Sequence, residues 1–138
     1  MPIHVRPVRE TDRPEWLRLR RLLWPDCPEE DHAAETAAYL RGPDLAVFVA
    51  EQDGGGLGGF VEAGLRREAQ GRGPGPVGYV EGWYVDADLR RRGVGRRLVL
   101  AAEDWARGRG CTDMASDADV GVEVVCYAKA NPNATAGG

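Results

Sequence analysis

The chain has 138 residues, of which 43% are hydrophobic and 29% are charged, with 22 acidic and 18 basic side chains. This length suits one domain, and the apolar fraction excludes wholesale disorder. No apolar run approaches the roughly 20 residues of a membrane span, and residues 1–6 contain no apolar signal segment. The three cysteines lack metal-binding spacing and cannot all pair with one another. We therefore expect a reduced, cytoplasmic protein without a metal site.

Charge is segregated along the chain. Residues 26–35 hold five acidic and no basic side chains, whereas residues 90–97 hold five arginines. The first segment suits a cationic partner and the second an anionic one. Two solvated faces would give the same pattern, so charge alone does not identify a partner.

The N-terminal part of the chain predicts a strand and two helices. Residues 3–8 form the strand, and Asp12 caps a first helix that ends at Trp24. The inward residues of this helix recur at helical spacing and are Trp16, Leu19, Leu22 and Leu23. The second helix spans residues 29–40 and ends at Gly42. Its inward residues are Ala33, Ala37 and Leu40.

The rest of the chain predicts short strands interrupted by one long helix. Strands are expected over residues 45–51, 57–65, 77–85, 111–115 and 122–129, with a loop over 66–76. The long helix spans residues 94–109, and residues 131–138 form a flexible tail. The element order β-α-α-β-β-β-α-β-β predicts one α/β (α+β) domain over residues 1–130, built around a mixed sheet.

Three glycines match a nucleotide-binding pattern in the wrong structural setting. Gly54, Gly56 and Gly59 satisfy G-x-G-x-x-G, which binds a dinucleotide only when a helix follows and its N-terminus faces the pyrophosphate. Here residues 60–63 continue as a strand. The glycines therefore predict a hairpin turn and no nucleotide site.

A second glycine motif lies in a setting that suits an anion. Residues 90–96 have the sequence Arg-Arg-Arg-Gly-Val-Gly-Arg and lie between a predicted strand and the long helix. A helix N-terminus presents unpaired backbone N–H groups, Gly93 and Gly95 allow close approach, and the arginines add charge-assisted contacts. We predict a pyrophosphate cradle, with a solvated arginine turn as the alternative. A nucleic-acid site is disfavoured because the chain is acidic and no aromatic residues interleave with the arginines.

These residues resemble a known family. Arg90-x-x-Gly93-x-Gly95, directly after the strand 79–85, is similar to the acetyl-CoA signature of the GNAT superfamily of N-acetyltransferases. Four further blocks resemble the aminoglycoside 6'-N-acetyltransferases of that superfamily, namely residues 22–26, 60–63, 76–82 and 111–118. The resemblance covers most of residues 3–129 and implies a GNAT fold, with a mixed central sheet flanked by helices.

The resemblance also assigns roles to individual positions. The residues that it implies for acetyl-CoA are Trp83, Tyr84 and Val85 along the pantetheine arm, and Arg91, Arg92, Gly93, Val94, Gly95 and Arg96 around the pyrophosphate. Those that it implies for the aminoglycoside are Trp24, Glu81, Asp117 and Glu123. Glu81 and Asp117 are also the implied catalytic residues, which bind the 6'-amine and accept its proton.

The residue types fit this chemistry. A polycationic aminosugar needs carboxylates to hold its ammonium groups, and attack on a thioester needs an amine that has lost its proton. Glu81 stands in an apolar strand, where an unpaired carboxylate is costly, and this favours a functional role. Trp24 at a helix end is also typical of a core residue, and Asp117 of a turn or cap.

One segment departs from the family pattern. Only residues 116–121 separate the last two predicted strands, whereas a parallel crossover needs a dozen or more residues. The family places a cofactor-contacting helix there. The helix before the last strand is therefore expected to be missing, through a deletion in the protein or through loss of the segment from the sequence.

The sequence predicts an acetyl-CoA-dependent N-acetyltransferase that modifies the 6'-amine of aminoglycosides and gives antibiotic resistance. Two alternatives stay open. One is a GNAT enzyme that acetylates another amine, on a polyamine or a peptide. The other is a non-catalytic CoA-binding protein damaged by the deletion. The family implies a homodimer, and we expect no metal, nucleic-acid or membrane partner.

Overall fold

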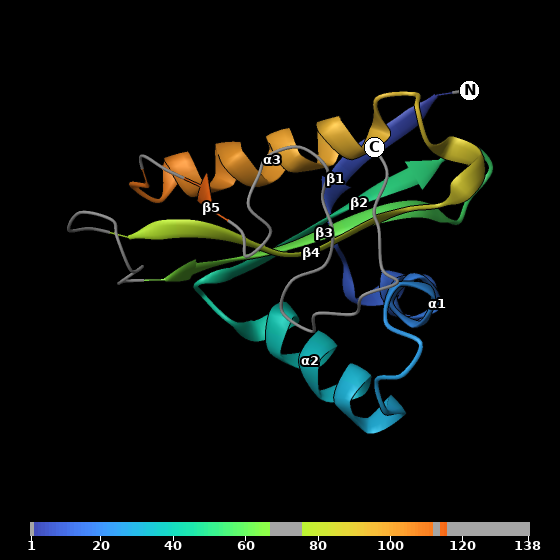
Figure 1. Cartoon of the computed structure of the whole chain (residues 1–138), viewed down its shortest axis with the longest axis horizontal. Helices are drawn as coiled ribbons and strands as arrows, with labels where there is room; N and C mark the ends of the chain where they lie inside the picture. The colour runs from blue at the N-terminus through green and yellow to red at the C-terminus, as the bar shows by residue number, and fades with distance from the viewer. Residues whose placement is uncertain (1, 67–75, 112–113, 116–138) are drawn as a thin grey trace.

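A computed structural model describes residues 2–66, 76–111 and 114–115 of the chain. Its five strands form one sheet in the order β1-β2-β3-β4-β5, with helix α3 over one face and helices α1 and α2 over the other (Figure 1). The strands are β1 Ile3–Pro7, β2 Leu45–Gln52, β3 Leu57–Arg66, β4 Val77–Val85 and β5 Met114–Ala115. The helices are α1 Arg13–Leu23, α2 Glu29–Arg41 and α3 Val94–Gly108.

The sheet is mixed, as the element order predicts. Strands β1 to β4 are antiparallel to their neighbours, whereas β5 runs parallel to β4 and pairs with it at Gly78 and Tyr79. The first eight elements therefore follow the predicted order. The strand expected over 122–129, the tail over 131–138 and the missing helix over 116–121 lie outside the described residues.

The glycine-rich turn between β2 and β3 is a hairpin, as predicted. All three residues of 54–56 have positive φ angles, of 92°, 103° and 82°, and the N–H of Gln52 donates to the carbonyl of Gly56. Since β3 follows directly, no helix N-terminus is available at these glycines for a pyrophosphate.

Two details of the N-terminal helices differ from the prediction. Asp12 precedes α1 but does not cap it, because its carboxylate accepts hydrogen bonds from the Arg6 guanidinium at 2.8 and 2.9 Å and from the Arg9 N–H at 2.7 Å. Leu22, expected inside, is 52% exposed. The buried Arg20 shares the inner face of α1 instead, and periodicity among apolar residues alone does not reveal it.

The inner face of α2 carries two buried polar residues that the sequence prediction missed. Ala33 is exposed, whereas His32 and Thr36 are fully buried. The Thr36 hydroxyl donates to the carbonyl of His32, four residues earlier. The imidazole of His32 accepts a hydrogen bond from Arg20, and Leu40, predicted to face inward, packs against the hydrophobic cluster around Trp16. This helix therefore docks through both polar and apolar contacts.

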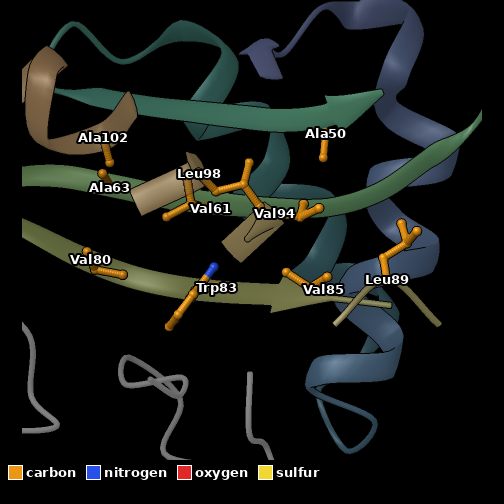
Figure 2. Close-up of a cluster of buried hydrophobic side chains, with 10 residues drawn as sticks. All are labelled: Ala50, Val61, Ala63, Val80, Trp83, Val85, Leu89, Val94, Leu98 and Ala102. Atoms are coloured by element: carbon orange, nitrogen blue, oxygen red, sulfur yellow. The ribbon is translucent and has the colours of Figure 1, made fainter. Parts of the chain in front are cut away.

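Two hydrophobic layers lie on opposite faces of the sheet. Figure 2 shows the layer beneath α3, whose buried residues are Ala50, Val61, Ala63, Val80, Trp83, Val85, Leu89, Val94, Leu98 and Ala102. The layer facing α1 and α2 consists of Trp16, Leu19, Leu23, Trp24, Val47, Val49, Leu57 and Phe60. Both strands contribute to both layers: in β3, Phe60 lies in one and Val61 in the other, as expected for a strand buried on both faces. In the described part of the chain, no helix is long and apolar enough to cross a membrane.

Candidate active site

Strand β4 carries a bulge at the residue expected to be catalytic. The register with β3 pairs Glu62 with Gly82 and Ala63 with Val80, so Glu81 has no opposite residue. A bulge of this kind breaks the alternation of faces. Glu81 and Gly82 therefore both face the α1–α2 side of the sheet: Glu81 bonds to a β3 side chain there, and Gly82 contacts the ring of Trp24.

The carboxylate of Glu81 is largely covered and ion-paired. Nη2 of Arg66, the last residue of β3, donates to Oε1 at 2.9 Å and to Oε2 at 3.1 Å. The side chain of Glu81 is 16% exposed and that of Arg66 is 40% exposed. The Arg66 guanidinium also lies 3.6 Å from the centre of the Tyr79 ring. In the free protein, a cation of the chain itself thus occupies the carboxylate expected to bind the substrate amine.

Trp24 occupies the core, the alternative role that its sequence position allows. It follows α1 directly and is 2% exposed. Its ring packs against Phe60 and beneath the Arg20 guanidinium, which lies 4.7 Å from the ring centre. A methyl group built on Gly82 would come within 2.5 Å of this ring. Trp24 therefore forms a wall directly behind the Glu81–Gly82 bulge.

The side chains of Trp83, Tyr84 and Val85 lie in the two core layers rather than in solvent. Trp83 and Val85 are buried on the α3 side, and Tyr84 is half-buried on the α1–α2 side. Contacts to a cofactor at these positions would therefore use the backbone. Within the described residues β5 pairs only with positions 78 and 79, so the same edge of β4 has no strand partner there over residues 80–85. In this part of the chain, the backbone N–H and C=O groups along that edge therefore have no strand neighbour, as contacts from β4 backbone to a ligand would require.

The arginine-rich turn joins the end of β4 to the start of α3. Arg90 Nε donates to the carbonyl of Val85 at 2.8 Å, and its guanidinium lies 5.3 Å from the centre of the Tyr84 ring, so this arginine holds the turn to the sheet. Gly93 takes a left-handed conformation, with φ 81°, at the residue before the helix. The first backbone bond of α3 runs from the Arg97 N–H to the Gly93 carbonyl.

The turn leaves the N-terminus of α3 uncapped and surrounded by positive charge. The backbone N–H groups of residues 94–96 precede the first hydrogen bond of α3, and no side chain caps them. The side chains of Arg91, Arg92 and Arg96 are exposed around them. Donors, helix dipole and guanidinium groups together fit a phosphate-bearing ligand at the end of the open edge of β4.

A buried polar cluster, absent from the sequence predictions, lies behind the bulge. Arg20 is fully buried and joins three elements: it donates to Glu62 on β3, and to Glu35 and to His32 Nδ1 (3.1 Å) on α2. The Trp16 indole N–H also donates to Glu62, at 2.9 Å. Glu62, like Glu81, is a carboxylate within an apolar strand. The same sequence signal could therefore have identified Glu62 as a residue with a special role.

The charges of this cluster depend on one another. Burial raises the pKa of the Glu62 carboxyl, while the Arg20 guanidinium acts in the opposite direction. Burial and the neighbouring Arg20 cation lower the pKa of His32. A neutral imidazole agrees with the geometry, since its unprotonated Nδ1 accepts a hydrogen bond from the Arg20 guanidinium. Removing one member of such a buried pair leaves the other charge uncompensated and costs about 3–5 kcal/mol.

The acidic segment 26–35 is partly neutralised within the protein. Arg21 bonds to both oxygens of Glu29, and Arg20 binds Glu35, so α1 supplies cations to two of the five carboxylates. Asp117 and Glu123, expected at the substrate site, lie outside the described residues. Among the described residues, no three histidine, cysteine, aspartate or glutamate side chains are grouped so that they could hold a metal ion.

Comparison with known proteins places this geometry in one family. Residues 15–124 match the model of the acetyltransferase (GNAT) family. The aminoglycoside N(6')-acetyltransferase type 1 of Klebsiella aerogenes is 47% identical over 116 residues, which are 82% of this chain and 76% of that protein. The structure of AAC(6')-Iy with the bisubstrate analog CoA-S-monomethyl-acetylneamine superposes with a TM-score of 0.81 at 34% identity, over 86% of this chain and 81% of that one. The aminoglycoside antibiotic 6'-N-acetyltransferase AAC(6')-Ih from Acinetobacter baumannii gives a TM-score of 0.79 at 33% identity, over the same shares of the two chains.

Proposed function

Because the chain belongs to the acetyltransferase (GNAT) family, we propose that it transfers the acetyl group of acetyl-CoA to the 6'-amine of aminoglycosides and so confers antibiotic resistance. One juxtaposition in the structure carries the proposal. Strand β4 holds a carboxylate, Glu81, at its bulge, and the same strand ends at an arginine-rich turn and the open N-terminus of α3. An acceptor amine and an anionic acetyl donor can thus meet along one strand.

The donor half of the site takes acetyl-CoA. The turn residues Arg91, Arg92, Gly93, Val94, Gly95 and Arg96 surround its pyrophosphate. The backbone of Trp83, Tyr84 and Val85 lines the pantetheine arm along the open edge of β4. Exposed guanidinium groups, free N–H groups and an edge without a strand neighbour in the described residues support this assignment.

The acceptor half of the site holds and deprotonates the amine. Glu81 accepts the proton of the 6'-ammonium group, directly or through water, and the neutral nitrogen then attacks the thioester carbonyl. The new C–N bond forms as the C–S bond breaks, and CoA leaves as the thiol after taking up a proton. Asp117 and Glu123 bind further ammonium groups, and Trp24 forms the wall behind the bulge. The rate gain comes mainly from proximity and proton transfer.

The setting of the reaction follows from the family resemblance. We propose a cytoplasmic homodimer that uses acetyl-CoA as co-substrate, needs no metal for any step, and has no nucleic-acid or membrane partner. A polyamine or peptide amine is the alternative acceptor. The acidic segment 26–35, in which Asp26, Glu30 and Asp31 are exposed, favours a polycation in either case.

Acetylation assays test the proposal. Purified protein is supplied with acetyl-CoA and a kanamycin-type aminoglycoside, and thiol release is compared with that for an analogue that lacks the 6'-amine. We expect turnover only with the 6'-amine, and a Glu81→Gln variant should lose about 10²–10⁴-fold in kcat because its amide cannot accept the proton. Equal rates on both compounds would contradict the regiochemistry. Acetyl-CoA binding in a thermal-shift assay without turnover would indicate a non-catalytic CoA-binding protein.

A further inference from the structure

Arg66 is an internal cation at the carboxylate of the proposed acceptor site. It ends β3, and its cross-strand partner is Val77 at the start of β4. From there its side chain runs over the Tyr79 ring and reaches both oxygens of Glu81. An ammonium group of a bound aminoglycoside would need the same two oxygens.

The surroundings leave little room for both cations. Glu81 is 16% exposed, and a Cβ built on Gly64 would lie 3.6 Å from its Oε2, so β3 backbone closes one side of the carboxylate. Trp24 fills the space against Gly82, the neighbour of Glu81 in the bulge. Both oxygens of this covered carboxylate accept hydrogen bonds from the Arg66 guanidinium, so a second cation would compete for the same acceptors.

Arg66 is held less firmly than Arg20, which lies on the same side of the sheet. Arg20 is fully buried with three acceptors in place, so it cannot leave Glu62 without losing all of them. Arg66 is 40% exposed, and its guanidinium can move into water while its aliphatic stem stays on Tyr79. An ion pair with one solvated partner is weak enough to exchange.

We propose that Arg66 acts as a built-in competitor of the substrate: its guanidinium neutralises Glu81 in the free enzyme and must be displaced by the acceptor ammonium. Arg66 is then a specificity-determining residue, because only an acceptor that places a cation at Glu81 can displace it. The inference rests on the proposed function, since it assumes that Glu81 binds the acceptor. Competition of this kind raises the apparent Kd for the acceptor, which equals the intrinsic Kd divided by the fraction of protein in which Glu81 is free of Arg66.

Calorimetric titration of the aminoglycoside neamine into the CoA-saturated protein tests this role. The Arg66→Met variant keeps the stem on Tyr79 and removes the charge. We expect its Kd for neamine to fall about three- to tenfold relative to the wild type, as expected from the strength of a half-exposed ion pair, with an unchanged Kd for acetyl-CoA. In a Glu81→Gln background, the same substitution should leave the neamine Kd unchanged, which a merely structural role of Arg66 would not predict.

Arg109→Met is the matched control. Arg109 also pairs with a carboxylate, that of Asp44 at 3.0 Å, and its guanidinium also lies over an aromatic ring, that of Trp105, but its ion pair does not involve Glu81. This variant should bind neamine as the wild type does. Arg66→Gln provides a second uncharged variant, and it should tighten binding in the same way if Arg66→Met does not fold.

The outcomes separate this inference from the proposed function. An unchanged or weaker neamine affinity in both folded Arg66 variants overturns the inference, even if the wild type acetylates aminoglycosides. Tighter binding in the variants of a protein that acetylates no aminoglycoside supports the inference and contradicts the proposed function. Absence of neamine binding in all variants overturns both.

Discussion

At the scale of single residues, two glutamates of the sheet show how surroundings change the role of one side chain. Glu62 and Glu81 both face α1 and α2, and each is paired with an arginine. Arg20 and Glu62 are both buried, so their pair holds α1 and α2 against the sheet. The partly exposed Arg66 leaves Glu81 able to exchange partners. The structural carboxylate of Glu62 and the proposed functional carboxylate of Glu81 thus differ in how freely their partner arginine can move.

His32 makes the stability of the folded protein sensitive to mild acid. Its pKa is lowered on folding, so the unfolded chain binds the proton more tightly than the native protein does. Stability is complete above the unfolded pKa of about 6.5 and falls as the pH drops below it. The Oδ1 of an asparagine can accept the same hydrogen bond from Arg20 but does not titrate. We therefore expect the melting temperature of His32→Asn to fall less between pH 7.5 and pH 5.5 than that of the wild type.

A histidine on the surface provides the control for this measurement. His4 on β1 is exposed, and His4→Asn should retain the wild-type change in melting temperature over the same pH interval. Identical pH profiles for the wild type and His32→Asn would show that the buried imidazole makes no such contribution.

At the scale of elements, the bulge in β4 couples the core to the proposed acceptor site. It places Glu81 and Gly82 side by side on one face, with the Trp24 ring against the backbone of Gly82. Only a residue without a side chain fits beneath the indole. The position of α1, which ends at Trp24, is thereby linked to the position of Glu81.

Gly82→Ala should disturb this link. The added methyl group would lie 2.5 Å from Trp24 Cη2 and 3.0 Å from Cζ2, so the ring must shift. We expect the free energy of unfolding to fall by about 1–3 kcal/mol, as for other overpacked cores. The KM for the aminoglycoside should rise because Glu81 moves with the bulge. Urea unfolding and steady-state kinetics measure the two effects.

Gly108→Ala is the matching substitution in open space. No atom lies within 4 Å of a Cβ built at this last residue of α3, and alanine favours a helix, so stability should stay the same or rise by up to about 1 kcal/mol. A Gly82→Ala protein as stable as the wild type would contradict the proposed contact.

The sequence predicted the boundaries of the helices and strands more accurately than it predicted which of their residues face the core. Short apolar runs bounded by glycine located β2, β3 and β4 almost to the residue, since turn chemistry is local. The two buried polar residues of α2, His32 and Thr36, were missed because they are buried only through partners on other elements. The bulge could not be predicted either, because it depends on the register between two strands.

For the candidate site, the sequence singled out strand β4 and the turn that follows it, and the roles of their residues stay predictions. Glu81 lies at the bulge of β4, and residues 91–96 lie around the start of α3. The role of Arg66 was not predicted, since an arginine at the border of a loop carries no local signal for a contact fifteen residues further along the chain. Trp24 matched the family pattern, yet its burial behind Gly82 is a property of the packed structure.

At the scale of the whole molecule, charges of opposite sign serve the two proposed ligands. The exposed arginines near the start of α3 suit the proposed anionic donor, and the exposed carboxylates of residues 26–31 suit the proposed cationic acceptor. Fields from exposed charges are screened beyond a Debye length of about 10 Å at 0.1 M salt. The affinities for both proposed substrates should therefore fall as the ionic strength rises, despite the opposite charges of the two substrates.

We expect the KM values for acetyl-CoA and for the aminoglycoside both to rise at least about threefold between 0.05 and 0.5 M NaCl, with little change in kcat. Arg96→Met should raise the KM for acetyl-CoA and weaken its salt dependence. Arg107→Met removes another exposed arginine, from the far end of α3, and should change neither. Salt-independent KM values would exclude long-range attraction as part of substrate capture.

The strand order has a consequence for how the protein forms during synthesis. Strands β2, β3 and β4 are contiguous in the chain and pair only with nearest neighbours, so their hairpins close short loops and can form early. Residues 45–85 leave the ribosome before any residue of α3 and before the two residues of β5. Among the described strands, the edge of β4 is thus the last to gain its neighbour, which covers only residues 78 and 79, next to the part proposed to receive acetyl-CoA. Until then the nascent chain carries it as an exposed strand, which is the kind of surface that chaperones shield.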